Sequence, residues 1–160
     1  MANLWWAATP LLHPLWNARA GLPITGICQG EAERLAREVG GRLPTSTEWG
    51  WMAGAGQRLY PWGQEEPTSA HANLRGLGPG RPTPPWSRAA GATPDGVLDV
   101  AGNVWEWTRT SVPGDGAVIR GGSYNSLTLY AQATYETEAP VHLRSAGIGV
   151  RPVKEETTCW

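Results

Sequence analysis

The sequence contains no phenylalanine, only two cysteines and no long apolar run. Charged residues make up just 17% of its 160 residues, and the formal net charge is −1. This balance provides no basic surface to hold a phosphate backbone, so no nucleic-acid partner is predicted. No stretch approaches the roughly 20 apolar residues that span a bilayer, and no membrane segment is predicted.

The two cysteines and the first residues bear on the compartment. Cys28 and Cys159 lie far apart in sequence, which does not indicate a disulfide framework. The N-terminus, MANLWWAATPLLHPLW, has no basic segment before its apolar stretch and is interrupted by Pro10 and Pro14. No signal peptide is therefore predicted, and a reduced cytoplasmic protein is the simplest interpretation.

The residues that are abundant indicate one α+β domain. With 21 glycines and 14 prolines, the chain should contain many short elements and long ordered loops. Its length suits a single domain over residues 1–160, with an irregular segment at 1–21 and a tail at 154–160. Short strands should outnumber the two helices that the pattern predicts.

Two helices are expected early in the chain. Residues 29–41 place apolar side chains at helical spacing, on Ala32, Leu35, Ala36 and Val39. Further on, Thr45 and Glu48 have the spacing of a capping box, in which a threonine hydroxyl accepts from a backbone amide and the glutamate reaches back. A helix of roughly 8 to 10 residues should begin there and end at Gly54 or Gly56.

The strands are less sharply defined. The pattern favours strands at residues 117–124, 128–135 and 147–153, and either a strand or an extended entry at 22–27. Residues 57–97 form a loop of a length that is unusual in a compact domain and indicates that it is either functional or held by something specific. A bound ion or buried tryptophans would supply that hold, and most of the ten tryptophans, notably Trp49, Trp62, Trp105 and Trp107, are expected in the core.

Six short motifs occur in one order along the chain: GRLPTSTEW, YPWG, HANL, GNVWEWT, RGGSY and GIGVR. Together they resemble the formylglycine-generating enzyme, or sulfatase-modifying factor, domain family over residues 22–152. The resemblance implies an irregular C-type lectin-like fold, with two helices packed on small antiparallel sheets and much loop. It also implies that the first strand and helix of the family are missing, which exposes an apolar edge. Either the fold tolerates this loss, or the N-terminal 27 residues and a partner chain cover the exposed core.

The resemblance argues against the reaction for which the family is named. In the enzyme, two cysteines five residues apart follow RGGS, bind copper(I) and attack the substrate. Ser126 and Ala131 stand at these positions here. Copper(I) needs soft thiolate ligands, so no copper is expected and no formylglycine should form.

A structural calcium ion is implied instead. The matching family site assigns side-chain ligands to Asp99 and Glu106 and backbone carbonyls to Gly102 and Val104, a set of oxygens that suits Ca²⁺. The alternative is a capped turn in which Glu106 accepts hydrogen bonds from backbone amides. A second family calcium site at Asn73 is less well matched, because the carboxylate that should follow is not evident.

The segment after RGGS is the candidate ligand groove. Its polar and aromatic residues combine rigid contact area with adaptable hydrogen bonding, and in the family this run lines the active-site groove. The alternative is a strand with one solvated face. The expected ligand-binding residues are Trp105, Ser123, Tyr124, Asn125, Ser126, Thr128, Tyr130, Gln132 and Tyr135.

Other groups of residues give weaker evidence for a metal or catalytic site. His13, His71 and His142 lack paired metal-ligand spacing, and the iron-binding histidines of the sulfoxide synthases that share this fold come from another domain. No nucleophile elbow surrounds the serines near RGGS, so a hydrolase triad is not predicted. Arg120 and Arg151 should make structural hydrogen bonds to glutamates such as Glu48 or Glu106.

Three hypotheses follow. The first is a binding module for a peptide or small molecule that uses the groove after RGGS. The second is a repurposed tailoring enzyme of a biosynthetic pathway, with a non-cysteine active site. The third is a structural subunit of a homo-oligomer.

Overall fold

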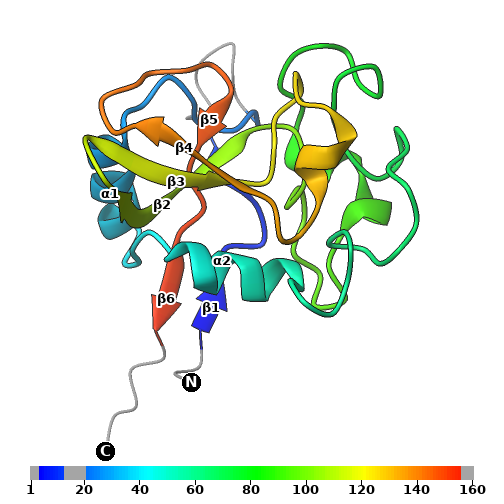
Figure 1. Ribbon diagram of the computed structural model, residues 1–160, viewed down its shortest axis with the longest axis horizontal. Coiled ribbons are helices and arrows are strands. Elements are labelled where there is room, and N and C mark those ends of the chain that lie inside the picture. Colours follow the sequence, from blue (N-terminus) through cyan, green and yellow to red (C-terminus); the bar gives the residue numbers. More distant parts are fainter. Residues whose placement is uncertain (1–3, 13–20, 156–160) are drawn as a thin grey trace, which may run out of the picture.

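The computed structural model describes residues 4–12 and 21–155 and has the predicted α+β class. Figure 1 shows two helices beside a curled sheet, with long loops gathered at one end. The elements are β1 (Leu4–Trp6), α1 (Gln29–Glu38), α2 (Ser46–Ala53), β2 (Trp105–Val112), β3 (Gly116–Arg120), β4 (Glu136–Pro140), β5 (Ile148–Gly149) and β6 (Val153–Glu155). Three 3₁₀ turns join them: η1 (Pro85–Ser87), η2 (Ala89–Gly91) and η3 (Thr128–Ala131).

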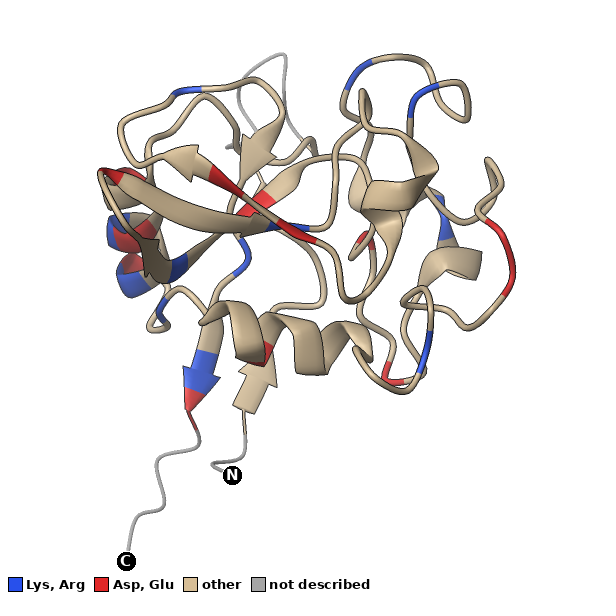
Figure 2. Cartoon of the chain, viewed as in Figure 1, with Lys and Arg blue, Asp and Glu red and all other residues tan. Residues whose placement is uncertain are grey.

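Both predicted helices are confirmed. Helix α1 buries Ala32 and Ala36 against the sheet, while its outer face carries charges of both signs (Figure 2). Helix α2 starts with the expected capping box, in which Thr45 Oγ1 accepts from the Glu48 amide at 3.1 Å and Glu48 Oε2 accepts from the Thr45 amide at 2.8 Å. It ends at Gly54, whose φ of +87° suits a glycine.

A four-stranded sheet with the order β4-β3-β2-β5 forms the centre of the domain. Strand β3 pairs antiparallel with both β2 and β4, whereas β5 pairs parallel with β2. Helix α1 and one face of the sheet enclose a core that includes Trp107 and Ile119. Helix α2 packs Trp49 and Met52 into a second apolar cluster.

The two ends of the chain form a small sheet of their own. Residues 4–6 pair antiparallel with β6, so part of the segment predicted to be irregular is a strand (Figure 1). Trp6 packs against the second apolar cluster, which covers part of the expected apolar edge. Trp5 remains 65% exposed, and a homo-oligomer stays a prediction.

The strand predictions were only partly right. Residues 128–135 do not form a strand: they begin with the η3 turn, and strand β4 starts at Glu136. Residues 147–153 supply two short strands, β5 and the start of β6, separated by Pro152. Residues 22–27 form no strand, apart from a single bridge between Leu12 and Pro23.

The long loop at 57–97 is braced by stacked rings. Trp62 lies between Tyr60, at a ring distance of 5.2 Å, and His71, at 4.8 Å. The Trp62 indole also donates to the Glu65 carbonyl, and Tyr60 donates its hydroxyl to Glu66. Trp62 is only half-buried and acts as a brace rather than as a core residue.

In the described residues, no helix has the length and apolarity that crossing a membrane requires.

Candidate functional site

Three aromatic rings from distant parts of the chain meet beside the end of strand β3. Trp105, the first residue of β2, lies 6.0 Å from the Tyr130 ring and 6.3 Å from the Tyr135 ring. The two tyrosines contact each other edge to face at 4.7 Å. All three side chains are half-buried, so each presents part of its ring to solvent. Trp105 packs against the edge of the core and is only partly buried, so its role as a ligand-binding residue stays a prediction.

Two buried serines, Ser123 at the end of RGGS and Ser126 three residues later, lie in the turn that precedes Tyr130. Ser126 Oγ accepts from the Ser123 amide at 2.9 Å, and the two hydroxyls lie 3.3 Å apart. Gly122, at φ +81°, brings the turn close to the Tyr130 carbonyl and the Ser126 side chain, where a Cβ would lie 3.4 and 3.5 Å from them. The Trp105 amide donates to the carbonyl of Gly147, whose own Cβ position is 3.5 Å from Ser123.

The remaining predicted ligand-binding residues near the rings are more exposed than the serines. Tyr124 and Gln132 are half-buried, and Asn125 and Thr128 are exposed. Arg75 fixes the turn by donating its Nε to the Asn125 carbonyl at 3.0 Å.

Sequence reasoning missed three residues of this rim. Leu127 and Leu129 are 51% and 52% exposed and give the η3 turn an apolar outer side. Figure 2 shows that this turn carries no charged residue. Nothing in the local pattern distinguished these leucines from the core positions of a strand. The role of Arg75 depends on a contact across 50 residues.

The titratable groups near the rings favour binding over acid–base chemistry. Burial and the neighbouring Tyr130 raise the pKa of the Tyr135 phenol above its usual value. A phenol in this state keeps its proton at neutral pH and can donate a hydrogen bond, but it is not a base. His142 lines a hollow with Asp115 and Glu138 at the start of β3, whereas Ser123 follows the end of that strand. Five strand residues span roughly 17 Å, so these residues do not form a triad.

The predicted calcium ligand Glu106 is fully committed to protein partners. Its Oε1 accepts from Arg151 Nε at 3.0 Å and lies 2.8 Å from Nη2 of the same arginine. Its Oε2 accepts from Arg151 Nε at 3.0 Å and from the Trp49 indole at 2.6 Å. Three N–H groups, of which the Arg151 Nε–H is shared between both oxygens, thus occupy most of the roughly four lone-pair sites of this carboxylate, and the guanidinium already neutralises its charge. Glu106 therefore fits a calcium ion poorly.

The other predicted calcium ligands lie in a tight turn before β2. Asp99 has a φ of +55° and is nearly completely buried. Burial is the main cause that raises the pKa of its carboxyl to about 7, opposed chiefly by the hydrogen bond from Asn103 Nδ2, 2.6 Å away. Gly102 allows the turn to pass the Asn73 carbonyl, which would lie 2.5 Å from a Cβ. Calcium binding by Asp99, Gly102 and Val104 stays a prediction.

The second family position, Asn73, is held by the loops around it. Its Nδ2 donates to Asn103 Oδ1 at 3.0 Å and to the Arg81 carbonyl at 2.9 Å. Its Oδ1 is buried without a hydrogen-bond partner, facing Gly78, where a Cβ would lie 1.9 Å away. Only glycine fits at that position, because the amide oxygen fills the space.

The arginine predictions were right for one pair. Arg151 binds Glu106 as expected, but Arg120 binds Glu136 and Ser46 instead, at 3.0 and 2.9 Å. Glu48 is bound by Arg42.

The positions of the family's catalytic cysteines are filled by small buried residues. Ser126 and Ala131 are 6% and 2% exposed, and neither supplies a thiol. Cys28 caps the start of α1, where its amide donates to Glu31. Cys159 and His13 lie outside the described residues.

Comparison with known proteins identifies the family of this chain. The sulfatase-modifying factor enzyme 1-like domain family matches residues 5–156. Hercynine oxygenase from Mycobacterium tuberculosis is 40% identical over 153 residues, covering 81% of this chain and 36% of that protein. The inactive C-alpha-formylglycine-generating enzyme 2 from Mus musculus is 29% identical over 149 residues, covering 75% of this chain and 46% of that protein.

Solved structures support the same fold. The Treponema denticola variable protein 1 superimposes with a TM-score of 0.76 at 15% identity, covering 95% of this chain and 84% of that one. At this identity the likeness shows the irregular C-type lectin-like fold alone. The chain spans less than half the length of the two curated relatives described above. The chain belongs to the sulfatase-modifying factor enzyme 1-like domain family.

Proposed function

We propose that this domain binds a peptide or small-molecule ligand in the groove formed by Trp105 and residues 123–135, and that it does not generate formylglycine. The observation that carries the proposal is the convergence of the Trp105, Tyr130 and Tyr135 rings next to a turn that holds a buried serine pair. Partly exposed aromatic rings supply contact area at small entropic cost, and the tyrosine hydroxyls supply hydrogen bonds.

The chemistry of the groove supports binding without formylglycine formation. Ser126 and Ala131 replace the thiols that the family uses to hold copper(I). The serine hydroxyls are hydrogen-bonded to each other and to backbone amides of their own turn, and among the described residues no histidine hydrogen-bonds to either. An inactive relative of formylglycine-generating enzyme matches most of this chain, so loss of that activity has a precedent in the family.

A thermal-shift screen of short peptides and small polar metabolites, followed by calorimetric titration of the hits, tests the proposal. Tyr130→Ala should weaken binding at least tenfold, since one stacked aromatic ring contributes on the order of 1–2 kcal/mol. Trp86→Ala is the matched control, because Trp86 is a 55% exposed aromatic residue in the separate turn η1. Equal losses in both variants, or no ligand at all from the screen, would remove the groove as the binding site.

A repurposed enzyme is the alternative, and the hercynine oxygenase match favours it. That relative is 40% identical over 81% of this chain, yet the chain covers only 36% of it. In this view the domain would supply the substrate-binding part of an oxygenase, and other segments would supply the chemistry. Titration with hercynine separates the two ideas. Binding that is lost in Tyr130→Ala would favour the enzyme, whereas a response only to unrelated ligands would favour the binding module.

A further inference from the structure

Arg151 makes an unusually complete set of hydrogen bonds in the interior. Its side chain and that of Glu106 are both 0% exposed. Besides binding the Glu106 carboxylate, the guanidinium donates to the Ala7 carbonyl at 2.9 Å through Nη1 and to the Leu98 carbonyl at 2.8 Å through Nη2. Nη2 also reaches the Asp99 carbonyl at 3.2 Å.

These oxygens are of the kind that a calcium ion collects. One carboxylate and three backbone carbonyls surround a single buried positive charge, and hard divalent cations select carboxylate and carbonyl oxygens. Two cations cannot share this carboxylate cheaply, because three N–H groups already occupy most of its lone pairs and like charges in a low-dielectric interior repel strongly.

We propose that the Arg151 guanidinium is the built-in structural cation at Glu106, in place of the calcium ion that the family resemblance assigns to that carboxylate. It joins the segment after β1, the turn before β2, strand β2 itself and the segment between β5 and β6. Trp49 of helix α2 is tied to the same carboxylate. The node therefore holds five parts of the chain together without a metal.

The node also supports the candidate groove. Trp105 and Glu106 are neighbours at the start of β2, and successive strand side chains point to opposite faces. Fixing Glu106 on the inner face fixes the direction in which Trp105 is presented to Tyr130 and Tyr135.

Nuclear magnetic resonance of the ¹⁵N-labelled wild-type chain tests the proposal at the site itself. The Trp49 indole N–H donates to Glu106, so its resonance reports on that carboxylate, and the Arg151 Nε–H reports on the other side. The Trp107 indole, which donates to the Ile27 carbonyl, is an internal control. Trp49→Phe identifies the Trp49 peak.

The proposal expects the Trp49 and Arg151 resonances to stay within a line width from an EDTA-treated sample up to about 10 mM Ca²⁺. Calcium-dependent shifts confined to the backbone of residues 99–104 would agree with it, because Glu106 would still not be a ligand. A saturable shift of the Trp49 indole, with Trp107 unchanged and a Kd below about 1 mM, would overturn it.

A second measurement uses stability. Arg151→Lys keeps the charge but lacks the fork of donors that serves three carbonyls and a carboxylate. We expect its Tm to fall by more than about 5 °C, equally in EDTA and in Ca²⁺. A fall seen in EDTA and abolished by Ca²⁺ would contradict the proposal, because the ion would then be able to hold the node.

Discussion

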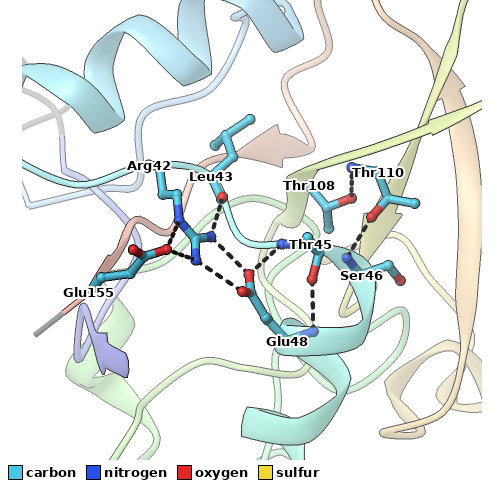
Figure 3. Close-up of polar contacts among 8 residues, drawn as sticks. All are labelled: Arg42, Leu43, Thr45, Ser46, Glu48, Thr108, Thr110 and Glu155. Carbon is cyan, nitrogen blue, oxygen red and sulfur yellow. Dashed lines mark hydrogen bonds and ion pairs between the residues drawn. The ribbon is translucent and has the colours of Figure 1, made fainter. Parts of the chain in front are cut away.

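Arg42 links the start of helix α2 to strand β6 through ion pairs (Figure 3). Its removal should lower the free energy of unfolding by an amount that depends on pH. Its Nη1 and Nη2 each donate to a different oxygen of Glu48 at 2.9 Å, and Nη2 also binds Glu155 at 2.7 Å. The Arg42 and Glu48 side chains are only 20% and 25% exposed. This geometry is the bidentate one that makes an ion pair count toward stability.

The size of this stability loss can be estimated from the pKa of the Glu48 carboxyl. The hydrogen bonds from Arg42 lower the pKa of Glu48 from 4.5 to about 2, with a further contribution from the Thr45 amide. At about 1.4 kcal/mol per unit, the full shift would correspond to roughly 3 kcal/mol. Allowing for solvent screening and for the share of Thr45, Arg42→Met should lower the free energy of unfolding by about 1.5–2 kcal/mol at pH 7. That change corresponds to a Tm lower by about 3–8 °C.

The sign of the pH dependence is fixed by the direction of the shift. Because the folded pKa of Glu48 is depressed, its contribution is complete above about pH 4.5 and is lost as the pH falls toward 2. The gap in Tm between wild type and Arg42→Met should therefore narrow over that window. Arg34→Met is the control, because Arg34 and Glu38 are 64% and 60% exposed and 3.9 Å apart. Equal effects of both variants, or a gap that is constant from pH 7 to pH 2, would refute the reasoning.

Three further predictions concern the cap, the buried acid and the lost thiols. Thr45→Ala removes the hydroxyl that caps α2 and should cost about 1 kcal/mol in urea unfolding, and an unchanged midpoint would exclude this role. The pKa of the Asp99 carboxyl is raised to about 7, so the free energy of unfolding should fall as the pH rises from about 4 to 7 and the carboxyl ionises. In EDTA, Asp99→Asn should flatten this fall in stability, whereas Asp95→Asn, at an exposed position, should leave it unchanged. The double variant Ser126→Cys with Ala131→Cys should gain 1:1 copper(I) binding in a competition assay with a chromogenic chelator, and the wild type should show none.

The helices could be predicted because their signals are local. The apolar spacing in residues 29–41 and the Thr45–Glu48 capping box each lie within a few residues, and both are realised in the fold. The prediction of a strand at 128–135 was wrong because the segment, although its apolar and polar residues partly alternate, has no partner strand. Strand β4, with the sequence ETEAP, reads as polar because it lies at the edge of the sheet and has one solvated face. Its existence depends on pairing with β3, which the sequence pattern does not show.

The site divides in the same way. The ring residues Trp105, Tyr130 and Tyr135 could be proposed from the motif order, because the family resemblance places that run beside a groove. The number of hydrogen bonds that the Glu106 carboxylate accepts could not be predicted from the sequence. Its partner Arg151 was foreseen, but whether a carboxylate has room for a metal depends on how many donors reach each oxygen from β2, α2 and the last segment. Such a count requires coordinates.

The ion-paired framework and the turn at 124–132 are separate regions, which explains how the side chains of the turn can change while the fold is kept. The ion pairs found among the described residues all lie outside the groove turn at 124–132, in helices, strands and their connections. The turn itself is held by backbone contacts, a serine pair and Arg75, which tolerate different outward-facing side chains. Replacing two thiols in this turn therefore removes a metal site without touching the nodes at Arg42 and Arg151. The scaffold can therefore stay the same while the side chains of this turn change, as expected when variable residues lie on loops that a rigid framework positions.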